Sequence, residues 1–333
     1  MKSYLFIGSK YLINYYFNDI IDGKVAIIDF LGDNYYTYDS SYNLKNKYTI
    51  LNKEYEIYNC NLEDEFYTIL TKFKPTDIVF GLYTGIEKIN VFKFLEYISK
   101  YNLKYKINLI CLFPFYVYNV IPLKIYFDTF KKLIKYYKIN TTIYIHGIVL
   151  GKNLTNSLIE KRIKFLYNNI DLPFPNYKYQ ELIPSNFIHM LDLKQIIMLT
   201  LKNRDNKINS FEIFNLCNNG DFTLERVDKI ISDYMKITLS KKINYSKLKK
   251  SKINEKIQKN YSYSFCMNLN DSIIDTLTWY NDTHLIKKEL TKEDKDYINK
   301  LTKEEKRTYL RKLNQNKLLN KDIINYLKSK IEM

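Results

Sequence analysis

The sequence predicts an α/β protein with a doubly wound parallel sheet, a smaller C-terminal α/β lobe and extra C-terminal helices. Short β-branched runs alternate with amphipathic stretches through the first half of the chain, which is typical of a parallel sheet covered by helices on both faces. The pattern changes beyond residue 170, and beyond residue 285 the chain becomes strongly charged. We therefore expect three regions: a dinucleotide-binding-type region at 1–170, a substrate-type lobe at 171–285 that shares its core, and a helical extension at 286–333.

The first region contains six predicted strands, each a short apolar or β-branched run. They are 3–7, 24–30, 55–60, 77–82, 107–113 and 142–146. Between and after them, apolar residues recur at helical spacing, which predicts five helices. These are 11–21, 63–73, 89–101, 123–137 and 154–168.

The second and third regions show fewer and different signals. After a Pro-containing segment at 172–175 we expect an apolar stretch at 187–193, a helix, a strand at 211–217 and a helix from Thr223. Residues 241–260 carry eight lysines against one glutamate and are expected to be exposed. The sequences Thr291-x-x-Asp294 and Thr302-x-x-Glu305 have the form of capping boxes, so two or three helices are expected over 291–330.

Composition limits the function without naming it. A chain of 333 residues that is 46% hydrophobic can bury a large core. The formal net charge of +16 fits affinity for a polyanion, but it also fits an overall bias toward Lys, Asn and Tyr. The longest apolar stretch, 107–123, is interrupted by Asn and Pro, so no membrane insertion is expected. Four widely spaced cysteines are expected to be core residues in a reducing cytoplasm.

Five short motifs in the correct order carry a resemblance to a known family. They are Asn-Phe-Ile-His-Met-Leu-Asp-Leu at 186–193, Phe-Glu-Ile-Phe-Asn-Leu-Cys at 211–217, a Thr-led helix at 223–230, Asp-Ile-Val-Phe-Gly-Leu at 77–82 and Thr-Trp-Tyr at 278–280. In these stretches the chain resembles the extended short-chain dehydrogenases, which include NAD-dependent sugar-nucleotide epimerases and dehydratases. The resemblance spans about residues 3–283 and implies a Rossmann-like fold.

The resemblance also implies a cofactor, NAD or NADP, and a nucleotide or nucleotide-sugar ligand. The family binds the pyrophosphate over three glycines after the first strand, because the backbone must approach the phosphates closely. Here only Gly8 remains, and Lys10 stands where the phosphate would lie. Asp29 is placed like the acid that binds the adenosine ribose, although a polar strand end explains it equally well. Asn61 and Leu62 stand where the family contacts adenine.

The family transfers a hydride with the help of a Ser/Thr–Tyr–Lys set, in which the lysine lowers the pKa of the tyrosine. Lys124 best matches the family's lysine, with Asp128 four residues later. In that frame the tyrosine position falls on Val120 and the hydroxyl position on Pro114. Tyr118 matches instead the tyrosine of a Val-Tyr-Gly turn, so an active enzyme would have to recruit Tyr118 or Tyr126 beside Lys124.

A second frame, which uses Tyr126, places Phe130 at the lysine position and leaves the helix too short. The substrate-side residues of the family fall on Ile145, Ile148 and Ser185 and are lost. His189 and Asp192 persist, and we expect them to hold a strand–helix junction. The three histidines have no metal-ligand spacing, so no metal is expected.

Three hypotheses follow. The coincident losses favour a catalytically degenerate protein that acts as a binding, structural or regulatory subunit. The second hypothesis is an active, divergent NAD(P)-dependent enzyme of sugar-nucleotide metabolism that uses Lys124. The third is an RNA- or polyanion-binding protein with residues 241–259 and the C-terminal helices as its basic surface. The resemblance further implies a homodimer through helices 89–101 and 123–137, and the charged C-terminal helices are candidates for binding a protein partner.

Overall fold

The structure is a computed structural model of the whole chain. It describes residues 2–7, 23–30, 49–50, 53–54, 56–60, 65–81, 90–118, 121–152, 159, 162–163, 166, 186–203, 210–216, 218, 222–236, 262–282, 292–315 and 321–332.

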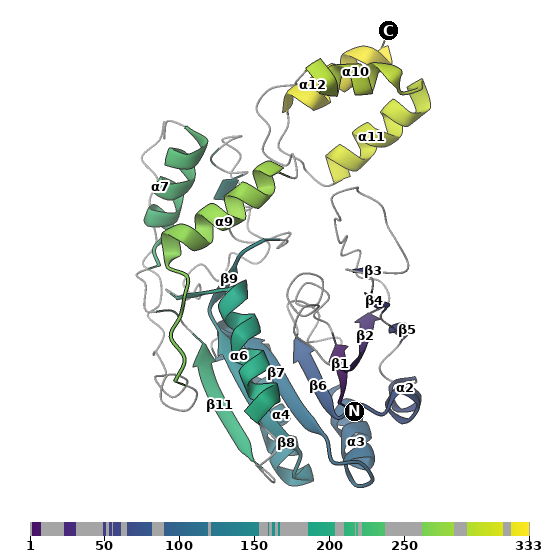
Figure 1. The fold of residues 1–333 in the computed structure, drawn as a ribbon, viewed down its shortest axis with the longest axis vertical. Coiled ribbons are helices and arrows are strands. Elements are labelled where there is room, and N and C mark those ends of the chain that lie inside the picture. The colour runs from purple at the N-terminus through teal and green to yellow at the C-terminus, as the bar shows by residue number, and fades with distance from the viewer. Residues whose placement is uncertain are drawn as a thin grey trace.

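A seven-stranded parallel sheet forms the centre of the molecule (Figure 1). Its strands are β1 (Ser3–Ile7), β2 (Lys24–Phe30), β5 (Glu56–Cys60), β6 (Asp77–Gly81), β7 (Asn108–Pro114), β8 (Asn140–His146) and β11 (Phe211–Leu216). The strands lie in the order β11-β8-β7-β6-β1-β2-β5. From β1 the chain adds β2 and β5 on one side, and from β6 onward it adds strands on the other side. The order of the strands therefore reverses between β1 and β6. A short antiparallel pair, β3 (Thr49–Ile50) and β4 (Lys53–Glu54), stands apart from this sheet.

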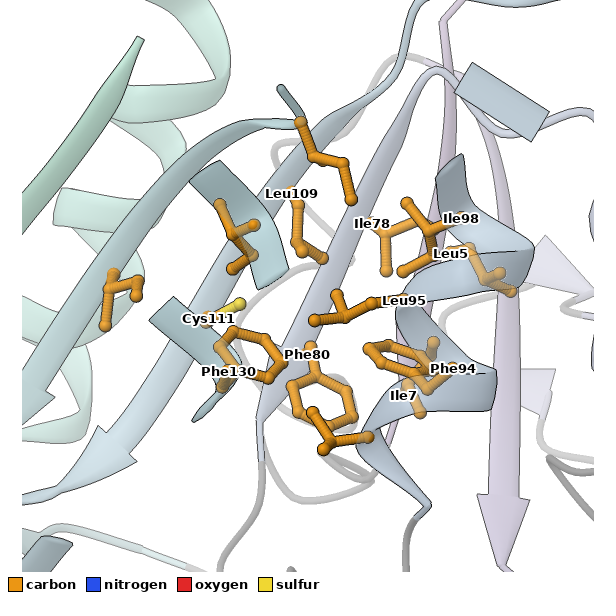
Figure 2. Packing of buried hydrophobic residues seen from close by; sticks show 14 of the residues in the cluster. Leu5, Ile7, Ile78, Phe80, Phe94, Leu95, Ile98, Leu109, Cys111 and Phe130 are labelled. Carbon is orange, nitrogen blue, oxygen red and sulfur yellow. The ribbon is translucent and has the colours of Figure 1, made fainter. Parts of the chain in front are cut away.

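Helices cover both faces of the sheet, so strand residues are buried on both sides. One face packs against α2 (Phe66–Phe73), α3 (Val91–Asn102) and α4 (Ile121–Tyr137). The other packs against α6 (Met190–Asn203). Figure 2 shows part of the first interface, where Phe80 of β6 lies between Phe94 and Phe130. The ring centroid of Phe80 lies 4.6 Å from that of Phe94 and 6.1 Å from that of Phe130. Aromatic packing therefore joins α3 and α4 to the centre of the sheet.

Polar side chains form a hydrogen-bonded row at the amino ends of four adjacent strands. Asn108 Nδ2 donates to Asp77 Oδ1 (2.9 Å), and Asn140 Nδ2 donates to Asn108 Oδ1 (2.7 Å). Ser210 Oγ then donates to Asn140 Oδ1 (2.6 Å). Because an ionised carboxylate only accepts, Asp77 determines which way each amide turns. We call Asp77, Asn108, Asn140 and Ser210 the amide ladder.

The C-terminal lobe lies beyond the carboxyl ends of the strands, above the arrowheads in Figure 1. It contains β9 (Ile148–Leu150) and β10 (Phe187–His189), which pair in parallel, together with α7 (Leu224–Met235) and α9 (Leu269–Asp282). These elements share one buried cluster, which includes Leu150, Phe187, Val227 and Ile273. The lobe therefore has a core of its own next to the edge of the sheet where the strands end.

Three helices follow this lobe: α10 (Lys292–Lys300), α11 (Lys303–Gln315) and α12 (Lys321–Glu332). They lie beyond α9 at the end of the molecule farthest from the amide ladder (Figure 1). Ile298 and Leu327 are fully buried between them. Thr302 and Glu305 form the predicted capping box, since Thr302 N donates to Glu305 Oε2 (2.8 Å) and Glu305 N donates to Thr302 Oγ1 (3.3 Å).

The predicted fold class is confirmed, and most predicted boundaries lie within a few residues of the observed ones. The apolar stretch at 187–193 divides between β10 and α6, because His189 Nδ1 accepts the N–H of Leu191 and starts the helix at Met190. Thr223 caps α7 as expected, by accepting from the N–H of Arg226. The predicted helix 11–21 lies outside the described residues. From the predicted helix 154–168 only Ile159, Arg162, Ile163 and Leu166 are described, all of them helical.

Candidate functional site

The carboxyl ends of the strands meet at one edge of the sheet, beneath the C-terminal lobe. The reversal between β1 and β6 makes this edge the expected ligand site, because open α/β sheets bind ligands where the strand order reverses. β1 ends at Ile7, β6 at Gly81, β7 at Pro114 and β8 at His146. We call the part formed by the ends of β7 and β8, with the first turn of α4, the catalytic edge.

Asp29 is the one predicted cofactor residue that the structure describes, as the penultimate residue of β2. It lies opposite Asn59 of β5, at the carboxyl end of the pair, and its role in binding the ribose stays a prediction. Gly8, Lys10, Asn61 and Leu62 lie outside the described residues.

Gly23, the next glycine after Gly8, serves the start of β2. Its φ is +156°, and a Cβ there would lie 2.5 Å from the carbonyl oxygen of Lys2. This glycine therefore fits a tight backbone approach within the sheet, and it does not replace a missing glycine of a phosphate-binding loop.

Lys124 lies in the first turn of α4 and is exposed. Asp128, its predicted companion, is turned to Lys131, whose Nζ lies 2.7 Å from Asp128 Oδ1. The hydrogen bond from Lys131 lowers the pKa of the Asp128 carboxyl, with a smaller contribution from the charge of Lys124. Tyr118 ends the short 3-10 helix Phe115–Tyr118 before α4, and its side chain lies outside the described part.

Tyr126, the tyrosine of the second frame, faces the core. Its ring stacks on Phe130 with centroids 6.4 Å apart, and its hydroxyl is buried without a hydrogen-bond partner in the described structure. Burial raises the pKa of this phenol, and the proximity of Cys111 adds to the shift. A phenol held in this way does not reach a ligand at the catalytic edge.

Pro114 and His146 are register partners at the carboxyl ends of β7 and β8. His146 is 2% exposed, and its Nδ1–H donates to the carbonyl of Gly147 (2.8 Å). Burial lowers the pKa of His146 to about 4, although the bond to Gly147 opposes the shift, so the ring is neutral at pH 7. Sequence reasoning missed this histidine, because a single His after a β-branched run has no spacing signal.

The loop after β8 passes close to the backbone of the C-terminal lobe. A Cβ on Gly147 would lie 2.3 Å from the carbonyl oxygen of Asn186, and Ile148 N donates to that same oxygen (3.0 Å). The N–H of Gly151 donates to Thr276 Oγ1 on α9 (2.9 Å). The chain beyond the catalytic edge is thus tied to the lobe by backbone contacts that favour glycine.

His189 joins three segments in this region, in agreement with its expected place at a strand–helix junction. Its Nε2–H donates to Asp275 Oδ2 on α9 (3.2 Å), and Lys152 Nζ lies 3.2 Å from the other oxygen of Asp275. Burial alone would raise the pKa of Asp275, but the bonds from His189 and Lys152 outweigh it and lower that pKa. Both ring nitrogens of His189 are therefore hydrogen-bonded, Nδ1 to the backbone N–H of Leu191 and Nε2 to the carboxylate of Asp275.

Asp192 fastens the segment before α9 to the first turn of α6. Its Oδ1 accepts from the hydroxyl of Tyr263 (2.6 Å), the N–H of Cys266 (2.9 Å) and the thiol of Cys266 (3.1 Å). The prediction that all four cysteines lie in the core is wrong for Cys266, which is exposed. Partial burial of the sulfur and the bond to Asp192 raise the pKa of this thiol to about 11, so the thiolate is a minor form at neutral pH.

The described residues contain no group of three or more His, Cys, Asp or Glu that could hold a metal ion. No helix in the described ranges is long and apolar enough to cross a bilayer.

The strand order, the helices on both faces and the lobe over the carboxyl edge define the fold of the extended short-chain dehydrogenases, as the sequence predicted. Among solved structures, the chain is similar to dTDP-glucose 4,6-dehydratase of Bacillus anthracis in complex with NAD, with a TM-score of 0.62 and 14% identity over 84% of this chain and 97% of that one. It is equally similar to UDP-glucose 4-epimerase of Thermotoga maritima with UDP-glucose, with a TM-score of 0.61 and 14% identity over 85% and 99% of the two chains.

A third similar structure is the enzyme WbmG of Bordetella bronchiseptica in complex with NAD and UDP, with a TM-score of 0.60 and 14% identity over 84% of this chain and 94% of that chain. No family model matches the sequence, and no curated protein matches it either. The similarity therefore concerns the fold.

Proposed function

We propose that this protein is a catalytically degenerate relative of nucleotide-sugar epimerases and dehydratases that acts as a binding, structural or regulatory subunit. The observation that carries the proposal is the pair formed by Pro114 and His146 at the catalytic edge. Pro114 supplies neither a hydroxyl nor a backbone N–H. The His146 ring is neutral, and its Nδ1–H is bonded to Gly147. Neither residue replaces the hydroxyl group that hydride transfer requires at the end of β7.

The lysine and tyrosine positions support the same proposal. Lys124 is exposed at the start of α4, but the residue four positions earlier is Val120, and Tyr126 is turned into the core. Neither Val120, which has no hydroxyl, nor Tyr126, whose hydroxyl is buried, offers a phenol that the ammonium group of Lys124 could activate. The tyrosine and lysine positions that the family uses to exchange a proton with the substrate are therefore not both filled in the described part of this edge.

We propose a nucleotide or nucleotide sugar as the ligand of the carboxyl edge. Asp29 at the end of β2 can accept hydrogen bonds from ribose hydroxyls. Tight NAD binding fits the chain less well. Of the two glycines between β1 and β2, only Gly8 lies directly after β1, and Gly23 is needed for the backbone contact at the start of β2. When bound, a nicotinamide cofactor would supply the hydride acceptor, and the family's remaining positions for it are Gly8, Lys10, Asn61 and Leu62.

A thermal-shift and turnover experiment tests both parts of the proposal. The full chain is incubated with NAD, NADP, UDP, UDP-glucose or dTDP-glucose, and Tm, absorbance at 340 nm and the sugar products are measured. We expect one of the uridine or thymidine ligands to raise Tm by about 3–5 °C near saturation, with no reduced cofactor and no altered sugar. An absence of shift with every nucleotide would contradict the proposed ligand.

The active-enzyme alternative rests on the exposure of Lys124 near the carboxyl edge. Lys124→Ala and Lys132→Ala provide a matched pair, since Lys132 is also exposed but lies two turns farther along α4. Product formation that Lys124→Ala abolishes and Lys132→Ala preserves would establish this alternative and overturn catalytic degeneracy.

A further inference from the structure

The positive charge of the protein is concentrated in two segments. Residues 283–333 carry 14 Lys or Arg against eight Asp or Glu, and residues 241–260 carry eight Lys against one Glu. The rest of the chain is nearly balanced, with 30 basic and 27 acidic residues. A uniform compositional bias would spread the excess evenly, so this distribution requires another explanation.

The first of these segments contains α10, α11 and α12, which follow the last helix of the C-terminal lobe. The similar structures cover 84–85% of this chain and 97–99% of their own. The 51 residues beyond Asp282 make up about 15% of the chain, a share of the same size as the uncovered part. The charged helices project beyond α9 (Figure 1).

Asn299 brings lysines from the three helices together. Its backbone oxygen accepts from Lys306 Nζ of α11 (3.5 Å), and its Oδ1 accepts from the hydroxyl of Tyr326 of α12 (3.1 Å). Lys330 Nζ lies 5.6 Å from the centroid of the Tyr326 ring. Lys300 is the next residue in α10, and Lys303 is one turn before Lys306. We call Lys300, Lys303, Lys306 and Lys330 the basic corner.

Two of the neighbouring acidic groups, Glu304 and Glu305, have partners at the start of α11. Glu305 accepts from the backbone and hydroxyl of Thr302, and these bonds lower its pKa. Glu304 lies 3.5 Å from Arg307, an exposed pair of little energetic weight. Glu305 keeps its negative charge and Glu304 is shared with Arg307, so the four lysines of the basic corner outnumber these two carboxylates.

The described side chains of α10–α12 favour one kind of partner. None of the described side chains of α10–α12 is an exposed large hydrophobic residue. Membrane-surface helices and protein-binding hot spots both need such residues, whereas contacts to a phosphate backbone need only cations and hydrogen-bond donors. The surface chemistry favours a polyanion that carries closely spaced phosphates.

We propose that the basic corner of the C-terminal helices binds the phosphate backbone of nucleic acid. The ammonium groups displace condensed counterions when they contact phosphates, so binding is independent of base sequence and falls steeply with salt. RNA and DNA share this chemistry.

The test measures fluorescence anisotropy of labelled single-stranded RNA, single-stranded DNA and duplex DNA with the full chain at 50, 100 and 200 mM salt. One variant replaces Lys300, Lys303, Lys306 and Lys330 with Gln. The matched control replaces four exposed lysines of the shared fold with Gln: Lys72, Lys104, Lys106 and Lys132. Both variants have the same net charge, and Gln retains helix propensity. Thermal melts confirm that both remain folded.

We expect the chain to bind at least one nucleic acid at 50 mM salt, and the three arms identify which. The basic-corner variant should bind at least tenfold more weakly, with a salt slope smaller by about 3 on single strands, and the control should change by less than threefold. An equal loss of affinity in the two variants would show that binding depends on the net charge of the protein, and it would overturn the proposal. Absence of binding at 50 mM salt, or binding only to anionic lipid vesicles, would also overturn it.

Discussion

At the scale of single residues, the amide ladder shows how one carboxylate orders a row of neutral groups. Asp77 accepts from Asn108, which leaves the Oδ1 of Asn108 to accept from Asn140. A one-residue slip of any strand would separate the ladder partners and turn that strand's side chains to the opposite face. The ladder therefore stabilises the register that brings the strand ends together.

Two substitutions at Asn108 test this role. Asn108→Leu should lower the free energy of unfolding by about 2 kcal/mol at any pH, since it removes the hydrogen bonds of Asn108 to Asp77 Oδ1 and to Asn140 Nδ2. Asn108→Asp places a second carboxylate beside Asp77, and repulsion raises the folded-state pKa of one of them. Its loss of about 2 kcal/mol at pH 7 should therefore shrink as the pH falls toward 4.5. Urea denaturation of wild type and both variants at pH 7 and pH 4.5 measures these changes in unfolding free energy. An Asn108→Asp variant that loses the same free energy at both pH values would contradict the role of the amide ladder.

His146 predicts a pH dependence of stability. Its folded pKa of about 4 lies below the unfolded value of 6.5, so the unfolded chain binds the proton more readily between these values. Stability from this group is complete above pH 6.5 and is lost as the pH falls toward 4. The loss should approach about 3 kcal/mol. His146→Gln should flatten the curve of unfolding free energy between pH 4.5 and 6.5, and an unchanged slope would show that His146 is not the group responsible.

At the scale of elements, a buried ion pair connects the helical residues around Arg162 to α7. Arg162 Nε donates to Asp228 Oδ1 (2.7 Å), and Arg162 Nη2 donates to Asp228 Oδ2. Both side chains are almost fully buried, at 8% and 0% exposure, among residues such as Ile163, Val227 and Ile231. Such a pair contributes little relative to apolar residues, yet each charge alone is costly.

A double-mutant cycle separates these effects. Arg162→Met should lower the free energy of unfolding by about 3–5 kcal/mol, because Asp228 would remain charged and buried. Arg162→Met combined with Asp228→Leu should recover most of that loss. The measurement is chemical denaturation of the two single variants and the double variant. Additive losses would show that the two side chains act independently.

Helix and strand signals in the sequence differed in strength for physical reasons. Strands such as β7 and β8 are buried on both faces and read as apolar runs, and Thr302 and Glu305 mark the start of α11 through their capping chemistry. β9 was missed, because a three-residue strand is too short to show a period, whereas the strand–helix junction expected at His189 corresponds to the end of β10. The losses at Pro114 and Val120 could be read from sequence. The neutral state of His146 and the inward turn of Tyr126 could not, since both depend on packing.

At the scale of the whole molecule, the exposed apolar residues of α3 and α4 favour the homodimer that the family resemblance implies. Ile121 is 73% exposed and Ile125 63% exposed on α4, and Phe92 is exposed on α3. Packing of α3 and α4 against a second copy would cover these side chains. The division of the chain at residues 170 and 285 and the catalytic role of Lys124 also stay predictions.

Charge insertion tests the dimer. Ile121→Glu combined with Ile125→Glu should convert a dimer to a monomer, because burial of two unpaired carboxylates at an interface costs several kcal/mol. Light scattering after size exclusion gives the mass. Ile274→Glu on α9 is the control for an added charge outside this face. A wild-type monomer at micromolar concentration would refute the dimer.

The position of the amide ladder bears on how such a protein changes over generations. The ladder lies about 20 Å from the carboxyl ends of β7 and β8, at the opposite edge of the sheet. Substitutions near Pro114 and His146 thus leave its hydrogen bonds intact, and a variant that loses a reaction there still folds. Natural selection can therefore relax at one edge of such a sheet while it continues to act at the other, so the architecture can persist while the ligand-facing residues change.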